Sequence, residues 1–284
     1  MRKHNKNYKT SSLSFYRTTN TLSDYFEADG LDDIRYAWDF AQASQRRFYV
    51  LGNGSNTILS QANIESVVVK NRRLEGWSHL GGHRYYIGSG ALVGKWLRAS
   101  FKVGLDAPYY LASVPAQIGG ALAMNAGRGE ANGKTIYDFV EAVEFVDLDS
   151  GKHYNEAPRD VVLGHRKTIF TGFPSRYYIL GAYLKQVRES FNGSDPIREH
   201  LVWARETQDH SGPNCGTVFC RSRGSAMKYL RGMRFGDAQF SKICSNWIIN
   251  RDPDPNSLMK LIRRASLVSY LLMKKPQVEH IIVD

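Results

Sequence analysis

The stretch Ser113-Val-Pro-Ala-Gln-Ile-Gly-Gly-Ala-Leu-Ala-Met-Asn-Ala-Gly127 consists mostly of small residues around one proline and one pair of adjacent glycines. Glycine costs conformational entropy on folding, so such a run is typical of backbone whose N–H groups approach a bulky anionic ligand. Close packing of a helix through small residues is the alternative explanation. A second segment, Tyr49-Val-Leu-Gly-Asn-Gly-Ser-Asn56, places a buried-strand pattern directly before a glycine-rich turn, an arrangement that holds pyrophosphate. Two such loops in one chain predict a dinucleotide ligand.

The motifs of the chain resemble those of the UDP-N-acetylenolpyruvoylglucosamine reductase (MurB) family of FAD flavoproteins. The matching segments are residues 51–56, 114–121, 125–127 and 164–170, in the order and roughly the spacing of that family. The likeness runs from about residue 22 to residue 282. The resemblance therefore implies FAD as the cofactor, and NADPH as the reductant if the family reaction is retained.

The resemblance also implies an α+β fold. A two-lobed FAD-binding domain of the vanillyl-alcohol-oxidase/PCMH type is expected over residues 1–190, with residues 1–20 as a flexible basic tail. A smaller α+β substrate-binding domain is expected over residues 191–284, with its C-terminal strand returning to the active site. The boundary is placed in the polar stretch Glu189-Ser-Phe-Asn-Gly-Ser-Asp-Pro196, which is rich in residues that break helices and strands.

Apolar spacing predicts the local elements. Helical spacing runs through residues 23–45, and Arg47-Phe-Tyr-Val-Leu51 then predicts a strand that enters the glycine turn. A broad apolar stripe predicts a helix over residues 257–273 that packs on the core. Further expected elements are strands at 67–70, 85–88 and 140–148 and a helix at 92–102.

The cofactor site implied by the resemblance draws on all three motif regions. Its residues are Leu51, Gly52, Asn53, Gly54, Ser55, Asn56, Ser113, Val114, Pro115, Ile118, Gly119, Gly120, Asn125, Gly127 and Arg166.

Two catalytic residues are carried over from the family motifs. Arg166, in His165-Arg-Lys-Thr168, matches an arginine whose planar guanidinium holds the substrate carboxylate through two parallel hydrogen bonds. On the sequence alone, an arginine between two basic residues is more often part of a solvated face. Thr217, in Gly216-Thr-Val-Phe-Cys-Arg-Ser222, stands where the family has its proton-donating serine and keeps the hydroxyl. The family's Lys-Asn-Pro, which serves substrate binding, is Cys-Arg-Ser here.

The third catalytic position is the family's final glutamate, which hydrogen-bonds the substrate and stabilises charge in the transition state. Alignment on Pro276 and Val278 puts Gln277 in its place, which keeps hydrogen bonding and loses ionisation. Residues two apart on a strand share a face, so Glu279 can present a carboxylate on the same side as Gln277. Both residues are therefore candidates.

Composition limits the class of protein and its partners. A chain of 284 residues with 42% hydrophobic content is long enough to bury a large core in two domains. The formal net charge of +11 is dispersed, and is compatible with phosphate-bearing small molecules, nucleic acid or an anionic membrane surface. No segment reaches the roughly eighteen apolar residues of a membrane span. We expect a small-molecule substrate that carries a carboxylate or a nucleotide, and neither a membrane nor a nucleic-acid partner.

Cysteine and histidine spacing gives two further expectations. Cys215, Cys220 and Cys244 show no CxxC spacing, which predicts reduced thiols in a cytoplasmic protein. The histidines lie at no metal-ligand spacing, so no metal site is expected and they are assigned to surface or core positions. Oligomeric state has no sequence signal.

Three functions remain open. The first is the family reaction, in which NADPH reduces FAD and reduced flavin reduces the enolpyruvyl group of UDP-N-acetylglucosamine enolpyruvate. The second is an FAD-dependent oxidoreductase on the same scaffold that acts on another substrate. The changed residues after Thr217 and the change to Gln277 favour this second reading. The third is a flavin-binding protein without turnover, whose basic surface contacts nucleic acid.

Overall fold

The computed structural model describes residues 3–72, 74–128, 133–220, 227–272 and 276–284. The chain divides into two compact units, each of which is assembled from segments that are distant in the sequence. Unit 1 consists of Met1–His4, Phe26–Asn53 and Val67–Trp203. Unit 2 consists of Asn5–Tyr25, Gly54–Ser66 and Ala204–Asp284.

A four-stranded sheet contains the strand that leads into the first glycine turn. Its order is β1 (Lys3–Thr10), β2 (Asn20–Ala28), β5 (Asn63–Asn71) and β3 (Phe48–Leu51). β3 and β5 are parallel, with Leu51 in register with Lys70 at their carboxyl ends. Since both strands end at the same edge, this edge is where an open sheet with parallel strands usually receives a ligand.

The structure corrects two predictions near the N-terminus. β1 is a strand, whereas residues 1–20 are predicted to be a flexible tail. The helix predicted over residues 23–45 begins only at Leu31 as α1 (Leu31–Ala43). β2 occupies the first part of that stretch and buries Tyr25 and Phe26, because two consecutive apolar residues fit a strand buried on both faces as well as a helix. The buried face of α1 belongs to the same hydrophobic cluster as residues of the sheet.

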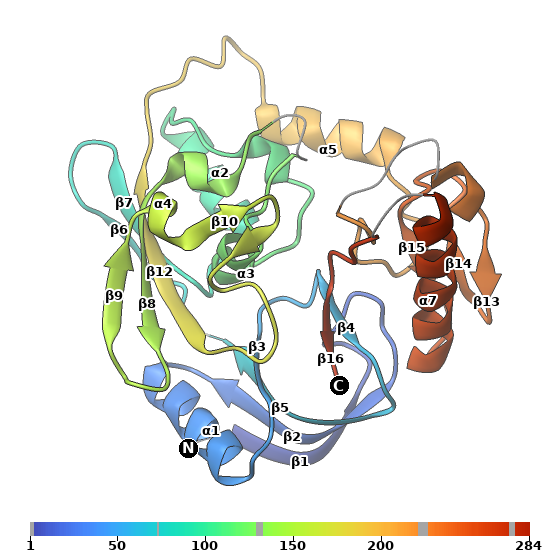
Figure 1. Cartoon of the computed structure of the whole chain (residues 1–284). Coiled ribbons are helices and arrows are strands. Elements are labelled where there is room, and N and C mark those ends of the chain that lie inside the picture. The colour runs from blue at the N-terminus through green and yellow to red at the C-terminus, as the bar shows by residue number, and fades with distance from the viewer. Residues whose placement is uncertain (1–2, 73, 129–132, 221–226, 273–275) are drawn as a thin grey trace. The chain divides into compact units, whose positions relative to one another are not determined.

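The core of unit 1 lies between an antiparallel sheet and short helices. The sheet order is β6 (Trp77–His79), β7 (Arg84–Gly88), β12 (Tyr177–Lys185), β8 (Val140–Asp147) and β9 (His153–Glu156). The α-helices are α2 (Val93–Lys102), α3 (Ile118–Ala123) and α4 (Pro158–Val161), with 3-10 turns at Tyr109–Leu111 and Ile136–Phe139. Trp96 of α2 is 1% exposed and packs with Leu122 of α3 and Val143 of β8. Figure 1 shows the three helices beside this sheet.

Unit 2 contains the C-terminal helix predicted from the apolar stripe. α7 (Pro255–Leu272) buries Leu258, Leu261, Ile262 and Ala265 in the same core as Phe240. The small sheet β13 (Arg234–Phe235), β14 (Ala238–Phe240) and β15 (Ile248–Asn250) contributes to this core. A parallel pair joins β4 (Thr57–Leu59), which follows the first glycine turn, to β16 (Ile281–Val283) near the C-terminus.

The helix α5 (Pro196–Thr207) begins in unit 1 and ends in unit 2. The predicted division at residue 190 therefore differs from the compact units, because unit 2 also takes up residues 5–25 and 54–66. Assignment of a substrate-binding role to residues 191–284 stays a prediction.

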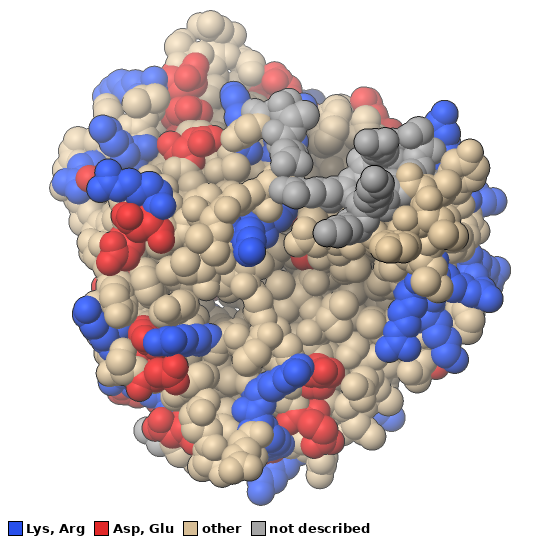
Figure 2. Space-filling view, viewed as in Figure 1, with Lys and Arg blue, Asp and Glu red and all other residues tan. Residues whose placement is uncertain are grey.

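The charged side chains are intermixed on the face that Figure 2 shows. Many Lys and Arg side chains on this face lie next to Asp or Glu. Arg84 and Glu141 form a bidentate pair at 2.8 and 2.9 Å. No helix among the described residues has both the length and the apolar content needed to cross a membrane.

Candidate active site

The first glycine turn, residues 52–56, connects β3 to β4. Gly54 has φ +75°, and a Cβ there would lie 2.0 Å from the Leu13 carbonyl oxygen, so only glycine fits. Within the described part of the chain, none of the five N–H groups of this turn donates a hydrogen bond. A short run of unused backbone donors next to a strand end is suited to an oxyanion such as a diphosphate.

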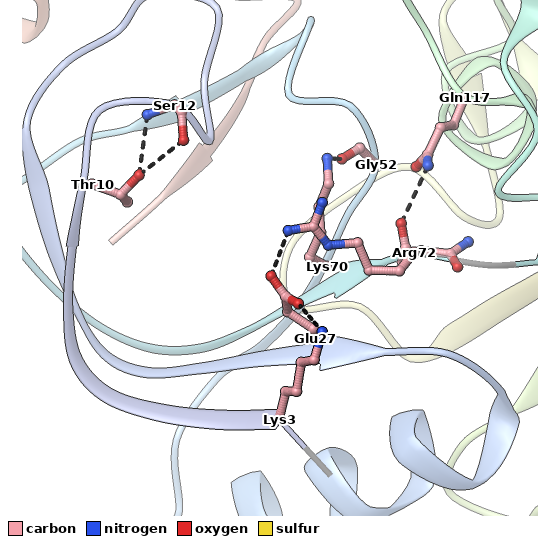
Figure 3. Close-up of polar contacts among 9 residues, drawn as sticks. Lys3, Thr10, Ser12, Glu27, Gly52, Lys70, Arg72 and Gln117 are labelled. Carbon is pink, nitrogen blue, oxygen red and sulfur yellow. Dashed lines mark hydrogen bonds and ion pairs between the residues drawn. The ribbon is translucent and has the colours of Figure 1, made fainter. Parts of the chain in front are cut away.

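The second loop lies against this turn within unit 1. Asn53 Nδ2 donates to the Pro115 carbonyl at 2.6 Å, and Gln117 Nε2 donates to the Asn71 carbonyl, at the end of β5, at 3.2 Å. Figure 3 shows this second contact. Two segments that are about 60 residues apart in the sequence are therefore joined by side-chain amides. The use of both loops for one ligand stays a prediction.

The two glycines of the second loop have different roles. A Cβ on Gly119 would lie 2.9 Å from the Ser89 Cβ, so Gly119 permits close packing, and its N–H donates to the Ser89 carbonyl at 2.8 Å. A Cβ on Gly120 would meet no atom within 4 Å. Close packing therefore explains Gly119, while Gly120 faces open space.

Arg166 lies in the turn between β10 (Val162–Gly164) and β11 (Lys167–Thr168), with φ +55°. Its Nη2 donates to the Gly127 carbonyl at 2.9 Å and its Nη1 to the Asn125 carbonyl at 3.4 Å. Asn125 Nδ2 in turn donates to the Gly164 carbonyl at 2.9 Å. The third motif is thus attached to the end of the second, as the predicted cofactor site requires.

Two side-chain oxygens near these motifs are buried without a hydrogen-bond partner in the described structure. They are Gln117 Oε1 and Asn125 Oδ1. Leaving a buried acceptor unpaired costs roughly 1–3 kcal/mol. Both oxygens are therefore candidates to accept a hydrogen bond from a bound ligand.

A cavity of about 670 Å³ lies in unit 1. It is lined by Tyr109, Tyr110, Arg128, His200 and Trp203, among others. His200 Nε2 lies 3.2 Å from the Ser113 Oγ of the second loop. Burial and the nearby charge of Arg128 lower the pKa of His200. The sequence did not predict these lining residues as a site, because they come from separate segments without a shared motif.

Thr217 belongs to unit 2, where it follows Gly216, which has φ +77°. Its neighbours pair with the C-terminal segment: Phe219 forms a bridge to Val278, Cys220 N donates to the Gln277 carbonyl at 3.1 Å, and Glu279 N donates to the Val218 carbonyl at 2.8 Å. The hydroxyl of Thr217 makes no hydrogen bond to another residue that the structure describes. Thr217, Gln277 and Glu279 thus lie on adjoining extended segments.

The C-terminal segment also reaches the first glycine turn within unit 2. Asn56 Nδ2 donates to the Glu279 carbonyl at 3.3 Å, and Ile281 N donates to the Asn56 carbonyl at 3.0 Å. The C-terminal segment is therefore hydrogen-bonded to the part of the cofactor motif that lies in unit 2, and its return to the active site stays a prediction. Arg166 belongs to unit 1, so its role beside the other three catalytic candidates stays a prediction.

His280 is buried beside Asn56. Its Nδ1 lies 2.7 Å from Asn56 Oδ1, and its Nε2 lies 2.9 Å from the Tyr16 hydroxyl. Because Asn56 uses its Nδ2 toward Glu279, its Oδ1 is the acceptor, so the His280 proton is on Nδ1 and Tyr16 donates to Nε2. Burial lowers the pKa of His280 to about 3, which keeps the ring neutral. Of the surface or core positions that the sequence left open for the histidines, His280 occupies a core one, and its link to the cofactor turn carried no sequence signal.

Comparison with known proteins agrees with this geometry. Residues 25–155 match the family model described as an FAD binding domain. UDP-N-acetylenolpyruvoylglucosamine reductase from Synechococcus sp. (strain JA-3-3Ab) is 27% identical over 259 residues, which cover 88% of this chain and 81% of the relative. The enzyme of the same name from Moorella thermoacetica (strain ATCC 39073 / JCM 9320) is 29% identical over 247 residues, covering 82% and 77%. The chain is a relative of the UDP-N-acetylenolpyruvoylglucosamine reductases.

The fold of these reductases extends over the whole chain. The crystal structure of the reductase (MurB) from Thermus caldophilus matches with a TM-score of 0.78 at 20% identity, covering 100% of this chain and 99% of that one. The predicted FAD-binding fold of the vanillyl-alcohol-oxidase/PCMH type is confirmed.

The reductase-like scaffold carries residues that fit FAD. The unused N–H groups of residues 52–56 suit a diphosphate, and the open side of Gly120 leaves room for a ligand against the backbone. The buried oxygens of Gln117 and Asn125 can accept from ligand N–H or O–H groups. FAD is therefore the cofactor that the motifs, the domain match and these atoms agree on.

Proposed function

We propose that this chain is an FAD-dependent reductase that uses NADPH as reductant and acts on a substrate bearing a carboxylate and a nucleotide. FAD supplies the hydride transfer when bound. The observation that supports this function best is the pairing of residues 218–220 with residues 277–279, which are joined through Asn56 to the cofactor turn. A hydroxyl, an amide and a carboxylate are thereby held on two paired segments, one of which is hydrogen-bonded to Asn56 of the turn.

Each catalytic candidate has a defined role in this proposal. Arg166 binds the substrate carboxylate, because a guanidinium offers paired donors in the geometry of a carboxylate. Thr217 gives its hydroxyl proton to the carbon next to the one that receives the hydride, so that one hydride and one proton complete the reduction. Gln277 hydrogen-bonds the substrate, and the Glu279 carboxylate provides the negative charge that stabilises the transition state.

The first acceptor to test is UDP-N-acetylenolpyruvoylglucosamine, since the relatives at 27% and 29% identity carry this substrate in their name. A different carboxylate substrate is the second candidate. It is favoured by Gln277, which cannot ionise where the family has a glutamate, and by Cys220, which replaces the family's lysine. A cytoplasmic location fits either substrate.

A single-turnover experiment separates the two candidates. The flavin is reduced anaerobically with one equivalent of NADPH, and the acceptor is then mixed in while flavin absorbance is followed. Reoxidation by UDP-N-acetylenolpyruvoylglucosamine within seconds supports the first candidate. Reduction by NADPH without reoxidation by this acceptor supports the second. A flavin that NADPH does not reduce would contradict the proposed function in both forms.

Variants of Thr217 test the proton-transfer role. Thr217→Ser keeps the hydroxyl and should retain reoxidation within about tenfold. Thr217→Ala should slow it by roughly 10²–10⁴-fold, the usual contribution of a positioned proton donor, while leaving NADPH reduction unchanged. Equal reoxidation rates in these two variants would remove Thr217 from the mechanism.

A further inference from the structure

Lys70 lies directly beside the first glycine turn, although no cofactor motif contains it. It is the last but one residue of β5 and stands in register with Leu51, the residue before the turn. Its Nζ donates a hydrogen bond to the Gly52 carbonyl oxygen. Figure 3 shows the Lys70 side chain reaching the Gly52 backbone.

The side chains around Lys70 leave an excess of positive charge. The Glu27 carboxylate forms ion pairs with Arg72 at 2.5 Å and with Lys3 at 3.5 Å. One negative charge is therefore shared among these two cations and Lys70. The charges that act on the Lys70 ammonium are Arg72, which repels it, and Glu27, which attracts it. Burial is the larger effect, and it lowers the pKa of Lys70 to about 8. The protein therefore maintains a cation at this edge at a free-energy cost.

Peptide geometry relates this cation to the ligand side of the turn. In a trans peptide group the C=O and the following N–H point in opposite directions. With the Gly52 oxygen held by Lys70, the N–H of Asn53 points away from Lys70. A positive charge at the oxygen end also increases the positive character of that N–H, which donates no hydrogen bond to any described residue. The turn is therefore oriented and polarised for an anion on the side opposite Lys70.

We propose that Lys70 is a positioning residue for FAD: its ammonium fixes the Gly52 carbonyl so that the N–H groups of the turn face the FAD diphosphate. Lys70 acts through the peptide group and the electrostatic field, without direct contact to the phosphate. An anion bound to the turn favours the charged form of Lys70. FAD binding should therefore raise the pKa of this amine and take up protons near pH 8.

The test compares FAD dissociation constants of Lys70→Met with those of a matched control, Lys95→Met. Lys95 on α2 is also a lysine that loses one charge, but it is exposed and pairs with Glu75 at 2.7 Å. Flavin is removed from the purified protein, and rebinding is followed by the quenching of FAD fluorescence. We expect about tenfold weaker binding for Lys70→Met at pH 7, as for the loss of one favourable charge interaction, and less than twofold change for Lys95→Met.

The pH profile distinguishes this role from a purely structural one. In the wild type and in Lys95→Met, FAD affinity should fall as the pH rises from 7 to 9.5, because Lys70 loses its charge. This part of the fall should be absent in Lys70→Met. Equal affinities and equal pH profiles for the wild type and Lys70→Met would overturn the proposal.

Proton uptake in the wild type keeps the proposal testable if Lys70→Met does not fold. Titration calorimetry at pH 8 in two buffers of different ionisation enthalpy should show a fraction of a proton taken up per FAD bound. No uptake, or no FAD binding to the wild type, would also overturn the proposal.

Discussion

Protonation of His280 should destabilise this protein when the pH falls from 7 to 5. The imidazole is 4% exposed and bridges Tyr16 and Asn56 in its neutral form. Protonation would place a positive charge in this buried network, where Asn56 Oδ1 is already occupied and Tyr16 is the donor. The folded state therefore resists protonation, while the unfolded chain accepts a proton freely.

The size of the effect follows from the two pKa values. The pKa is about 6.5 in the unfolded chain and about 3 in the folded protein. Because the pKa is lower in the folded state, the stability is fully present above pH 6.5 and decreases as the pH falls toward 3. A pH of 5 is about 1.5 units below the pKa of the unfolded chain. Protonation of the unfolded chain therefore lowers the free energy of unfolding at pH 5 by about 2 kcal/mol, at 1.36 kcal/mol per unit. At pH 7 the same contribution is only about 0.2 kcal/mol.

The assay is urea unfolding at pH 7 and pH 5 for the wild type, His280→Gln and a control, His153→Gln. Glutamine can still donate to Asn56 and cannot titrate, while His153 is an exposed residue of β9. Between pH 7 and pH 5, the free energy of unfolding should fall by about 2 kcal/mol more in the wild type and the control than in His280→Gln. Equal losses in all three proteins would refute the buried, neutral assignment of His280. So would an NMR titration in which its ring protonates near pH 6.5.

Three further substitutions test the site. Gly54→Ala should destabilise the protein by at least about 2 kcal/mol in urea unfolding and abolish FAD binding, since it adds a clash with the Leu13 carbonyl to backbone strain. Gly81→Ala, where φ is also positive but no atom lies within 4 Å, should cost only about 1 kcal/mol, and an equal cost would contradict the clash. In Arg166→Ala loaded with FAD and reduced by NADPH, reoxidation by the carboxylate acceptor should be at least about 100-fold slower in stopped flow; unchanged reoxidation would remove Arg166 from the catalytic residues. Gln117→Leu should weaken FAD binding about tenfold by fluorescence titration if its buried Oε1 accepts from the cofactor, whereas unchanged affinity would exclude that contact.

The parts of this molecule that the sequence predicts well are those with a local pattern. The strand before residues 52–56 is a continuous apolar run, and the helix at 92–102 and the long helix α7 have apolar residues at helical spacing; the structure confirms all three. Glycine positions are also informative, because a glycine by itself marks a local backbone requirement. Other residues do not tolerate the positive φ of Gly54 or the close approach at Gly119.

The features that the sequence did not predict depend on contacts between distant residues. β1 is polar and its burial is slight, so only its pairing in the sheet makes it a strand. His280 meets Asn56 across 224 positions and Tyr16 across 264, and Lys70 meets Gly52 through the pairing of two parallel strands. A single histidine or lysine has no spacing pattern, so these roles become visible only when the strands are placed side by side.

The measurement that tests the central claim most directly is the visible spectrum of freshly purified protein, followed anaerobically after NADPH is added. An FAD-dependent reductase should show a flavin band that bleaches on reduction and returns with an acceptor. A protein that is colourless and does not take up added FAD would contradict the cofactor assignment, and with it the proposed function. A bound flavin that stays oxidised in the presence of NADPH would contradict the proposed reductase.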